Sequence, residues 1–122
     1  MNDQTIAQAI ETAAPQAPRI TPADIQANIV SEHYFTAKNG VDGALQEETG
    51  FTEALGMPES LSLLTFCVLV LRNGFTVTGE SACASPENFN AEIGRMVARR
   101  NAEAKIWPLM GYELRSKLQG TT

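Results

Sequence analysis

The chain has 122 residues, of which 43% are hydrophobic and 19% are charged, and its formal net charge at pH 7 is −5. This balance predicts one compact domain, because the chain is too short for two ordinary domains and too apolar to stay disordered. No apolar run approaches the roughly 20 residues of a membrane-spanning helix. The first residues lack the basic and apolar stretches of a secretory signal. We therefore expect a soluble domain of intracellular type with no membrane partner.

Charge is distributed unevenly along the chain. Residues 1–64 hold nine acidic and two basic residues, whereas residues 65–122 hold five acidic and seven basic residues. A net negative chain binds duplex DNA poorly, because neutralising phosphates requires clustered lysine and arginine. The basic excess of the second half still leaves room for a local site that binds a small anion.

The chain lacks the spacings of common metal and catalytic sites. Its two cysteines, Cys67 and Cys83, form no CxxC motif, and its one histidine, His33, cannot build a metal site alone. Paired catalytic carboxylates, a P-loop, a GxGxxG motif and a Ser-His-Asp arrangement are not found. We expect reduced thiols, no metal and no cofactor, and an enzyme is disfavoured.

The first third of the chain predicts a loose arm followed by a helix. Residues 1–18 are rich in Ala, Gln and Pro, and we expect them to form a flexible arm before a single domain over residues 19–122. Thr21-Pro22-Ala23-Asp24 is a helix start, with a capping hydroxyl, a proline at the first helical position and an early acid. This helix is expected over about residues 22–35.

The next segment, residues 36–60, is rich in Gly, Glu and Thr. Asn39-Gly40 and Asp42-Gly43 are turn signals. A short helix is expected over residues 46–55, where Gly56 breaks it.

A β-hairpin is the strongest pattern in the chain. Residues 61–71 predict a strand, Asn73-Gly74 a two-residue type I′ turn, and residues 75–81 the return strand. This register pairs Leu71 with Thr76. The expected core face holds Leu64, Phe66, Val68, Val70, Phe75, Val77 and Cys83, and the opposite, half-polar face holds Thr65, Cys67, Leu69, Leu71, Thr76, Thr78 and Glu80. Because the two cysteines fall on opposite faces, an intrachain disulfide is disfavoured.

A second helix is expected to begin at Ser85-Pro86 and to run for about 18 residues. At 100° per residue its apolar stripe holds Phe89, Ile93, Met96, Val97 and Ala104. Arg95 and Arg99 fall on the outer side, whereas Arg100 falls inside the stripe. A short amphipathic tail follows over residues 112–118. Together these elements predict a single α+β domain, in which an antiparallel hairpin or small sheet packs against two or three helices.

The three arginines of this helix are the most informative charges. Arg100 on an apolar face either lies along that face or pairs with a carboxylate, for which Glu80 is the natural partner, or it binds an anion in a pocket. Arg95 and Arg99 are like-charged neighbours four residues apart, which slightly destabilises a helix. They form either a solvated face or the flank of a phosphate or a partner acid.

A polar row on the return strand is the second candidate. Thr76, Thr78 and Glu80 form either an exposed or dimer-facing surface or a set of contacts to a ribose or phosphate. Gly79 within the strand indicates close approach by a ligand or a neighbouring element. Most aromatic side chains of the second half are expected in the core, and one, such as Phe75 or Phe89, is available to stack on a base.

Several stretches together resemble a known family. They are LTFCVLVLRNGFTVTGESAC (residues 64–83), SPENFNAEIGR (85–95), KIWPL (105–109), RITP (19–22) and SEHYFTA (31–37). The chain is identified from them as a member of the gene-49/gene-66-like family of small tailed-phage and prophage proteins, over residues 19–118. This resemblance implies an accessory phage protein that acts in the host cytoplasm, and it carries little chemistry.

In size and layout the chain is also similar to phage anti-Thoeris sponge proteins. Those bind cyclic ADP-ribose-type signals, and some bind cyclic oligonucleotides, without cleaving them, as homo-oligomers with pockets between subunits. The similarity implies a non-enzymatic anti-defence protein, a dimer or an assembly of dimers, that sequesters such a signal. Residues 36–60 are an insertion that could alter or block such a pocket.

Binding residues do not follow from this similarity, so we assign them on physical grounds. We expect the hairpin face with Leu69, Leu71, Thr76 and Thr78 to pair subunits. The expected ligand-binding residues are Phe75, Thr76, Thr78, Glu80, Asn88, Phe89, Arg95, Arg99 and Arg100. The alternative is a phage inhibitor that binds a host protein through its acidic N-terminal half. An enzyme acting on nucleotides is the least favoured interpretation.

Overall fold

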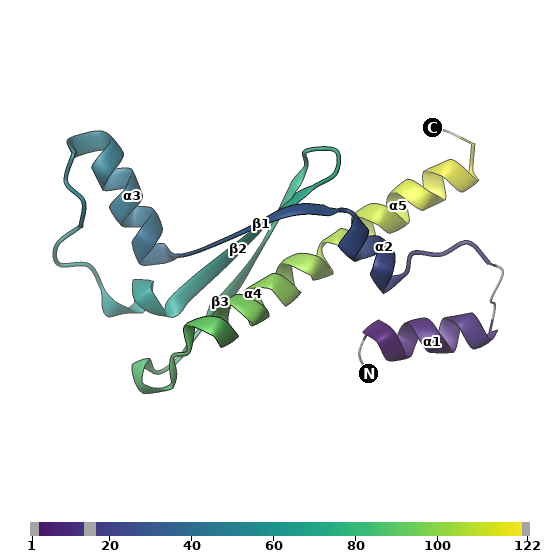
Figure 1. Cartoon of the computed structure of the whole chain (residues 1–122), viewed down its shortest axis with the longest axis horizontal. Helices are drawn as coiled ribbons and strands as arrows, with labels where there is room; N and C mark the ends of the chain where they lie inside the picture. The colour runs from purple at the N-terminus through teal and green to yellow at the C-terminus, as the bar shows by residue number, and fades with distance from the viewer. Residues whose placement is uncertain (1–2, 14–16, 121–122) are drawn as a thin grey trace.

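The computed structural model describes residues 3–13 and 17–120. Its elements are α1 (Asp3–Ala13), α2 (Pro22–Ala27), β1 (Ile29–Thr36), α3 (Ala37–Thr49), the 3-10 turn η1 (Glu59–Leu63), β2 (Leu64–Leu71), β3 (Thr76–Ala82), the 3-10 turn η2 (Pro86–Asn88), α4 (Ala91–Ala104) and α5 (Ile106–Leu118). The strands form one antiparallel sheet in the order β1-β2-β3, and α4 packs along β3 and β2 (Figure 1). The predicted α+β class is confirmed. None of the helices within the described ranges is long and apolar enough to cross a membrane.

The N-terminal segment contains a helix, α1, none of whose residues is buried. On this helix Ile6 borders a cavity of about 190 Å³ that it shares with Trp107 of α5. The expected looseness of residues 1–18 stays a prediction, and its residues 1–2 and 14–16 lie outside the part of the chain that the structure describes.

Part of the helix expected over residues 22–35 is a strand, so that prediction is wrong beyond its first turns. Thr21 caps α2 as predicted, and its hydroxyl accepts the backbone N–H of Asp24 at 3.2 Å. The chain then enters β1, whose sequence IVSEHYFT is rich in the β-branched and aromatic residues that favour strands. The expected helix rests on Ile25 and Ile29, which lie four residues apart. This spacing suits a helix but also an alternating strand, so it did not distinguish the two. His33 therefore lies on a strand, exposed, with its Nε2 3.0 Å from the Ser31 hydroxyl.

A helix also replaces the turns expected within residues 39–43. α3 begins after Thr36, whose hydroxyl accepts the Asn39 N–H at 3.1 Å, while the Asn39 side chain accepts the Thr36 N–H at 2.9 Å. This reciprocal capping box starts the helix and overrides the turn preference of the glycines that follow. α3 ends before Gly50, at φ +83°, so the helix expected over residues 46–55 is right only in its first part.

α3 projects from the sheet, and the segment that follows it returns toward β2 (Figure 1). The Asp42 carboxylate joins the helix to this segment, because it accepts the Ala54 N–H at 2.8 Å and lies 2.7 Å from the Lys38 ammonium. Lys38 also lies 3.3 Å from the Glu53 carboxylate. We call residues 37–58 the α3 lobe, a projection that is braced from within.

The β2–β3 hairpin is confirmed, but its register differs by one residue from the prediction. The Leu71 N–H donates to the Phe75 carbonyl at 2.8 Å, and the Gly74 N–H donates to the Leu71 carbonyl at 2.9 Å. Gly74 alone in this turn has a positive φ, at +90°, whereas a type I′ turn needs two such residues. The loop therefore has three residues with glycine at the left-handed position, and Val70 pairs with Thr76 instead of with Val77.

The face of β2 that packs in the core is the opposite of the one expected, whereas on β3 Val77 is buried as predicted. The buried residues of the hairpin are Thr65, Cys67, Leu69, Leu71, Val77 and Gly79, whereas Leu64, Phe66, Val68 and Val70 are half-buried on the uncovered face. Phe75, also expected inside, is 57% exposed at the hairpin tip. Because β2 is apolar on both faces, alternation could not orient it. The expected subunit-pairing face is also wrong, since Leu69 and Leu71 are buried while Thr76 and Thr78 are exposed on the other side.

The close approach of α4 to β3 explains this choice of face. A Cβ atom on Gly79 would lie 2.2 Å from the Ala98 carbonyl oxygen and 2.3 Å from the Ala102 nitrogen. The helix presents its smallest residues there, and Gly94, Ala98 and Ala102 are its buried positions. The apolar stripe expected to pack on the sheet faces outward instead, with Met96 63% exposed. The prediction failed because it weighed side-chain size rather than how closely two backbones meet.

The C-terminal residues form a longer helix than the expected tail. α4 begins later than predicted, because Ser85-Pro86 opens only the turn η2 and Asn90 caps the helix. α5 then starts directly after Lys105. Pro108 sits in its first turn, where a missing N–H costs no hydrogen bond. The side chain of Ile106 is fully buried and completes the core.

We predict that Gly79→Ala lowers the free energy of unfolding by about 3 kcal/mol, because the added methyl group meets backbone atoms that cannot rotate away. Chemical denaturation of the two proteins measures this. Gly43→Ala is the matched control, since nothing lies within 4 Å of its added Cβ. It should instead raise stability by up to about 1 kcal/mol through helix propensity in α3. A Gly79→Ala protein as stable as the wild type would contradict the packing.

A second prediction concerns the brace of the α3 lobe. The Ala54 N–H, followed by the Lys38 ammonium, holds the pKa of the Asp42 carboxyl below its ordinary value. When folding lowers the pKa of a carboxyl, the ionised carboxylate stabilises the folded state at pH values above the pKa of the unfolded chain. This stabilisation is lost as the pH falls through the lower pKa of the folded state. The brace is therefore complete at pH 7. Asp42→Asn should speed amide hydrogen exchange at Ala54 but not at Leu69. An exchange rate at Ala54 that is equal in the variant and the wild type would contradict the brace.

Candidate functional site

Arg99, Arg100 and Arg95 leave α4 in different directions, although they are close in sequence. The Arg99 guanidinium lies between elements, with Nη1 2.9 Å from the Glu32 carboxylate on β1 and Nε 3.0 Å from Glu103. Its Nη2 donates to the Gln26 side chain at 2.8 Å. Arg99 thus meets partner acids, one of the alternatives open from the sequence, and it ties α4 to the sheet and to α2.

A half-buried tyrosine adjoins this network. The Tyr34 hydroxyl donates to the Glu32 carboxylate at 3.2 Å, on the side of the sheet that α4 covers. Burial, with smaller contributions from Cys67 and Glu32, raises the pKa of Tyr34 to about 12. Burial also raises the pKa of the Cys67 thiol, and both Cys67 and Cys83 are free. The Tyr34 hydroxyl and the Cys67 thiol therefore stay protonated at neutral pH.

Arg95 borders a cavity of about 190 Å³ between β1, the start of α3 and the first turns of α4. The lining residues are Tyr34, Phe35, Thr36, Asn39, Thr65, Phe89, Ala91 and Arg95. Among the described residues, Arg95 has no ion-pair partner. An available guanidinium, aromatic rings and an amide therefore border one small space.

Two of the predicted ligand residues, Arg95 and Phe89, meet at this cavity. Asn88 lies on the other side of Phe89, at a second cavity of about 200 Å³ that is also bordered by Asn90 and Ile93. Phe89 borders both spaces. The predicted residues from the first turns of α4 and the preceding segment thus gather at one end of the helix.

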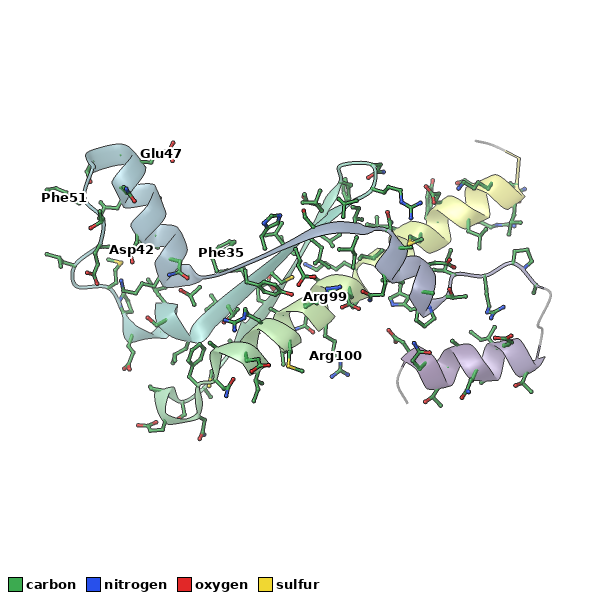
Figure 2. The ribbon with its side chains drawn as sticks, in the orientation of Figure 1. Phe35, Asp42, Glu47, Phe51, Arg99 and Arg100 are labelled. Atoms are coloured by element: carbon green, nitrogen blue, oxygen red, sulfur yellow. The ribbon has the colours of Figure 1, made fainter. Side chains whose placement is uncertain are left out.

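The polar row of β3 lies elsewhere. Thr76, Thr78 and Glu80 are exposed on the face of the sheet that α4 does not cover, so the sheet separates them from the α4 arginines. The expected pairing of Glu80 with Arg100 does not occur. The Glu80 carbonyl instead accepts the Asn101 side-chain N–H at 2.7 Å, and Arg100 points away from the sheet (Figure 2).

Sequence reasoning missed the part of the cavity that β1 and α3 supply. Tyr34 and Thr36 were assigned to a helix end and a loop, and Asn39 to a turn. The signal that could have found them is the Thr36-x-x-Asn39 spacing, which is close to a capping-box pattern. It would have placed a helix start, and therefore ordered side chains, beside the strand.

A larger cavity than that of Arg95, of about 380 Å³, lies between the hairpin loop and α5. Its cationic side chains are already engaged. Arg72 Nη2 donates to the Ala27 carbonyl at 2.6 Å, and Lys117 lies 3.6 Å from the Glu113 carboxylate. Within residues 3–13 and 17–120, no group of three or more His, Cys, Asp or Glu residues is arranged to hold a metal. The Arg95 cavity is therefore the stronger candidate for an anionic ligand.

The different surroundings of the two arginines predict different effects on stability. Arg99→Met should lower the free energy of unfolding by about 1–2 kcal/mol, because it leaves two carboxylates without their shared partner. Arg95→Met should change it by less than about 0.5 kcal/mol, since among the described residues the Arg95 side chain has no ion pair to lose. Urea denaturation measures both values, and a larger loss for Arg95→Met would contradict the assignment.

Comparison with known proteins identifies a family. The model of the phage protein (N4 Gp49/phage Sf6 gene 66) family matches residues 20–118. No curated protein and no solved structure matches the chain. The matched range contains the sheet, the α3 lobe and both C-terminal helices, and therefore every residue of the Arg95 cavity. The chain belongs to the N4 Gp49/phage Sf6 gene 66 family of phage proteins.

Proposed function

We propose that this phage protein is a non-enzymatic accessory protein that binds and sequesters a nucleotide signal of host defence in the host cytoplasm. The signal would be a cyclic ADP-ribose-type molecule or a cyclic oligonucleotide. Family membership supports the phage accessory role. The observation that carries the finer proposal is the Arg95 cavity, where an arginine without an ion-pair partner meets Phe89 and Asn39.

The lining residues match the parts of a nucleotide. The Arg95 guanidinium has the donor geometry that binds phosphate oxygens in pairs. The half-buried Phe89, which borders the cavity, offers an apolar contact for a base, and the Thr36 and Asn39 side chains offer polar groups to a ribose. Ala91, in the first turn of α4, also borders the cavity, and the positive end of a helix favours an anion.

The size of the cavity limits how much of the ligand it holds. About 190 Å³ is less than the roughly 300–1,000 Å³ of a typical small-molecule pocket. One nucleotide unit would enter, and the rest of a cyclic ligand would lie over the protein surface beside the cavity. The homo-oligomer that we propose would then carry one such site in each chain.

The chemistry of the lining supports sequestration rather than turnover. Its residues include no carboxylate, histidine or cysteine, which are the usual proton-transfer and nucleophilic groups. Its one tyrosine, Tyr34, has a pKa raised to about 12 by burial and by nearby Cys67 and Glu32, so it is a poor base at neutral pH. A bound signal would therefore be held and released unchanged.

A second candidate function is the inhibition of a host protein through the acidic half of the chain. The α3 lobe favours it, because Phe51, at the far end of the lobe (Figure 2), is 70% exposed and Leu55 is 88% exposed. Exposed Glu47 and Glu48 lie on the same lobe. A partner with a basic rim around an apolar groove would fit such a surface.

Calorimetric titration of the purified protein with a panel of cyclic ADP-ribose-type molecules and cyclic oligonucleotides tests the lead proposal. We predict stoichiometric binding of at least one of them, recovered intact after heating. Arg95→Ala should weaken this binding by about tenfold or more. Arg115→Ala, an exposed arginine on α5, is the matched control and should leave the affinity unchanged.

Three results would contradict the lead proposal. They are the absence of binding to both classes of signal, an Arg95→Ala protein with full affinity, and new products in chromatography of the incubated nucleotide. Replacing Phe51 and Leu55 by Ser separates the two candidates, because it should abolish host-protein inhibition and leave nucleotide affinity unchanged.

A further inference from the structure

α4 has two packing faces, and only one of them is covered. Gly94, Ala98 and Ala102 lie against the sheet. At about 100° per residue, the larger apolar residues fall on the opposite side of the helix. They are Ile93, 59% exposed, Met96, 63% exposed, and Val97, 39% exposed. This outer apolar stripe is what an amphipathic helix normally buries, so it requires a partner of its own.

The accessible surface area of the chain is larger than that of a compact monomer of its mass. Its accessible surface is 8371 Å². A compact monomer of 13.2 kDa would expose only about 6,400 Å². Part of this excess belongs to α1 and α3, none of whose residues is buried, and part to the exposed outer stripe of α4. Each partner in a stable interface of standard size buries roughly 800 Å².

The charges around the stripe indicate what the partner is. Glu92 and Arg100 lie at opposite ends of the stripe, and neither has an ion-pair partner among the residues that the structure describes. If two copies of α4 cross in opposite directions about the point between Met96 and Val97, Arg100 of each copy comes beside Ile93 and Glu92 of the other. A parallel arrangement would instead bring the two Arg100 residues together, which like charges disfavour.

We propose that the outer face of α4 docks on the same face of a second copy of this chain, in an antiparallel pair. Ile93, Met96 and Val97 form its apolar centre, and Arg100 of each copy pairs with Glu92 of the other. Such a surface is self-complementary, as a twofold interface must be. Arg100 is thereby an interface residue, and the pairing does not depend on a bound nucleotide.

The proposal goes beyond ligand binding, because Arg95 and its cavity lie on a different side of the helix. It also differs from pairing through the open face of the sheet. That face carries half-buried Phe66, Val68 and Val70, but its acid, Glu80, has no arginine or lysine on the same face. The α4 face has both an apolar centre and matched charges, so it is the better surface for a second copy.

Sedimentation of the full chain tests the pairing by charge reversal. The wild-type protein should be dimeric or an assembly of dimers. Arg100→Glu and Glu92→Arg should each weaken self-association by about tenfold or more, because each places like charges together. Combining the two substitutions should restore the affinity to within about threefold of wild type, since the pairs form again with reversed polarity. Met96→Asp should abolish the dimer.

Matched controls separate pairing from net charge. Arg115→Glu changes the net charge by the same amount as Arg100→Glu, and Glu47→Arg changes it by the same amount as Glu92→Arg. Neither of these two control substitutions should affect self-association. Circular dichroism should show each variant to be folded. A monomeric wild-type protein would overturn the proposal. A dimer that none of these variants weakens would also overturn it, because the chains would then pair through another surface, such as the open sheet face. A third contradicting result is a combined variant that self-associates no more tightly than the single variants.

Discussion

The close approach of α4 to β3 at Gly79 is the contact on which the rest of the structure depends. Only a residue without a side chain lets the helix backbone come so near, and α4 faces the sheet there with its small buried residues Gly94, Ala98 and Ala102. This choice fixes the rotation of the helix. It leaves the larger apolar residues outside and keeps the core small, with Leu69 and Ile106 among its few large side chains.

The same rotation gives three neighbouring arginines three different surroundings. Arg99 reaches the carboxylate of Glu32 on β1 and holds the helix to the sheet. Arg95 borders the cavity with Phe89, where its charge is available to an anion. Arg100 points away from the sheet (Figure 2). We propose that a ligand and a second copy of the chain meet the latter two, so that binding and assembly use separate sides of one helix.

Local signals predicted the α+β class, the start of α2 at Thr21 and the hairpin around Gly74, because capping and turn chemistry depend on a few adjacent residues. They missed β1, since the apolar spacing there fits either a helix or a strand. They also assigned β2 the wrong buried face, because this strand is apolar on both faces. Which face α4 covers is decided at Gly79, and the sequence marked that residue only as a point of close approach.

The candidate site was partly predictable for the same reason. Arg95 and Phe89 were found because charge and aromatic character are visible in a sequence. Their meeting with Tyr34 and Asn39 depends on β1 and on the capping box that starts α3, which periodicity does not reveal. The β3 residues Thr76 and Thr78 were grouped with them because they form a polar row on the return strand, but this row lies on the face of the sheet that α4 does not cover.

The packing of α4 is tested most directly by nuclear Overhauser contacts in the folded protein. We predict contacts from the α-protons of Gly79 to the methyl groups of Ala98 and Ala102, with the Met96 methyl showing none to the side chain of Leu69. Contacts from Met96 and Val97 to Leu69 would contradict this. They would mean that the helix buries its apolar stripe after all, and the positions inferred for the three arginines would then be wrong.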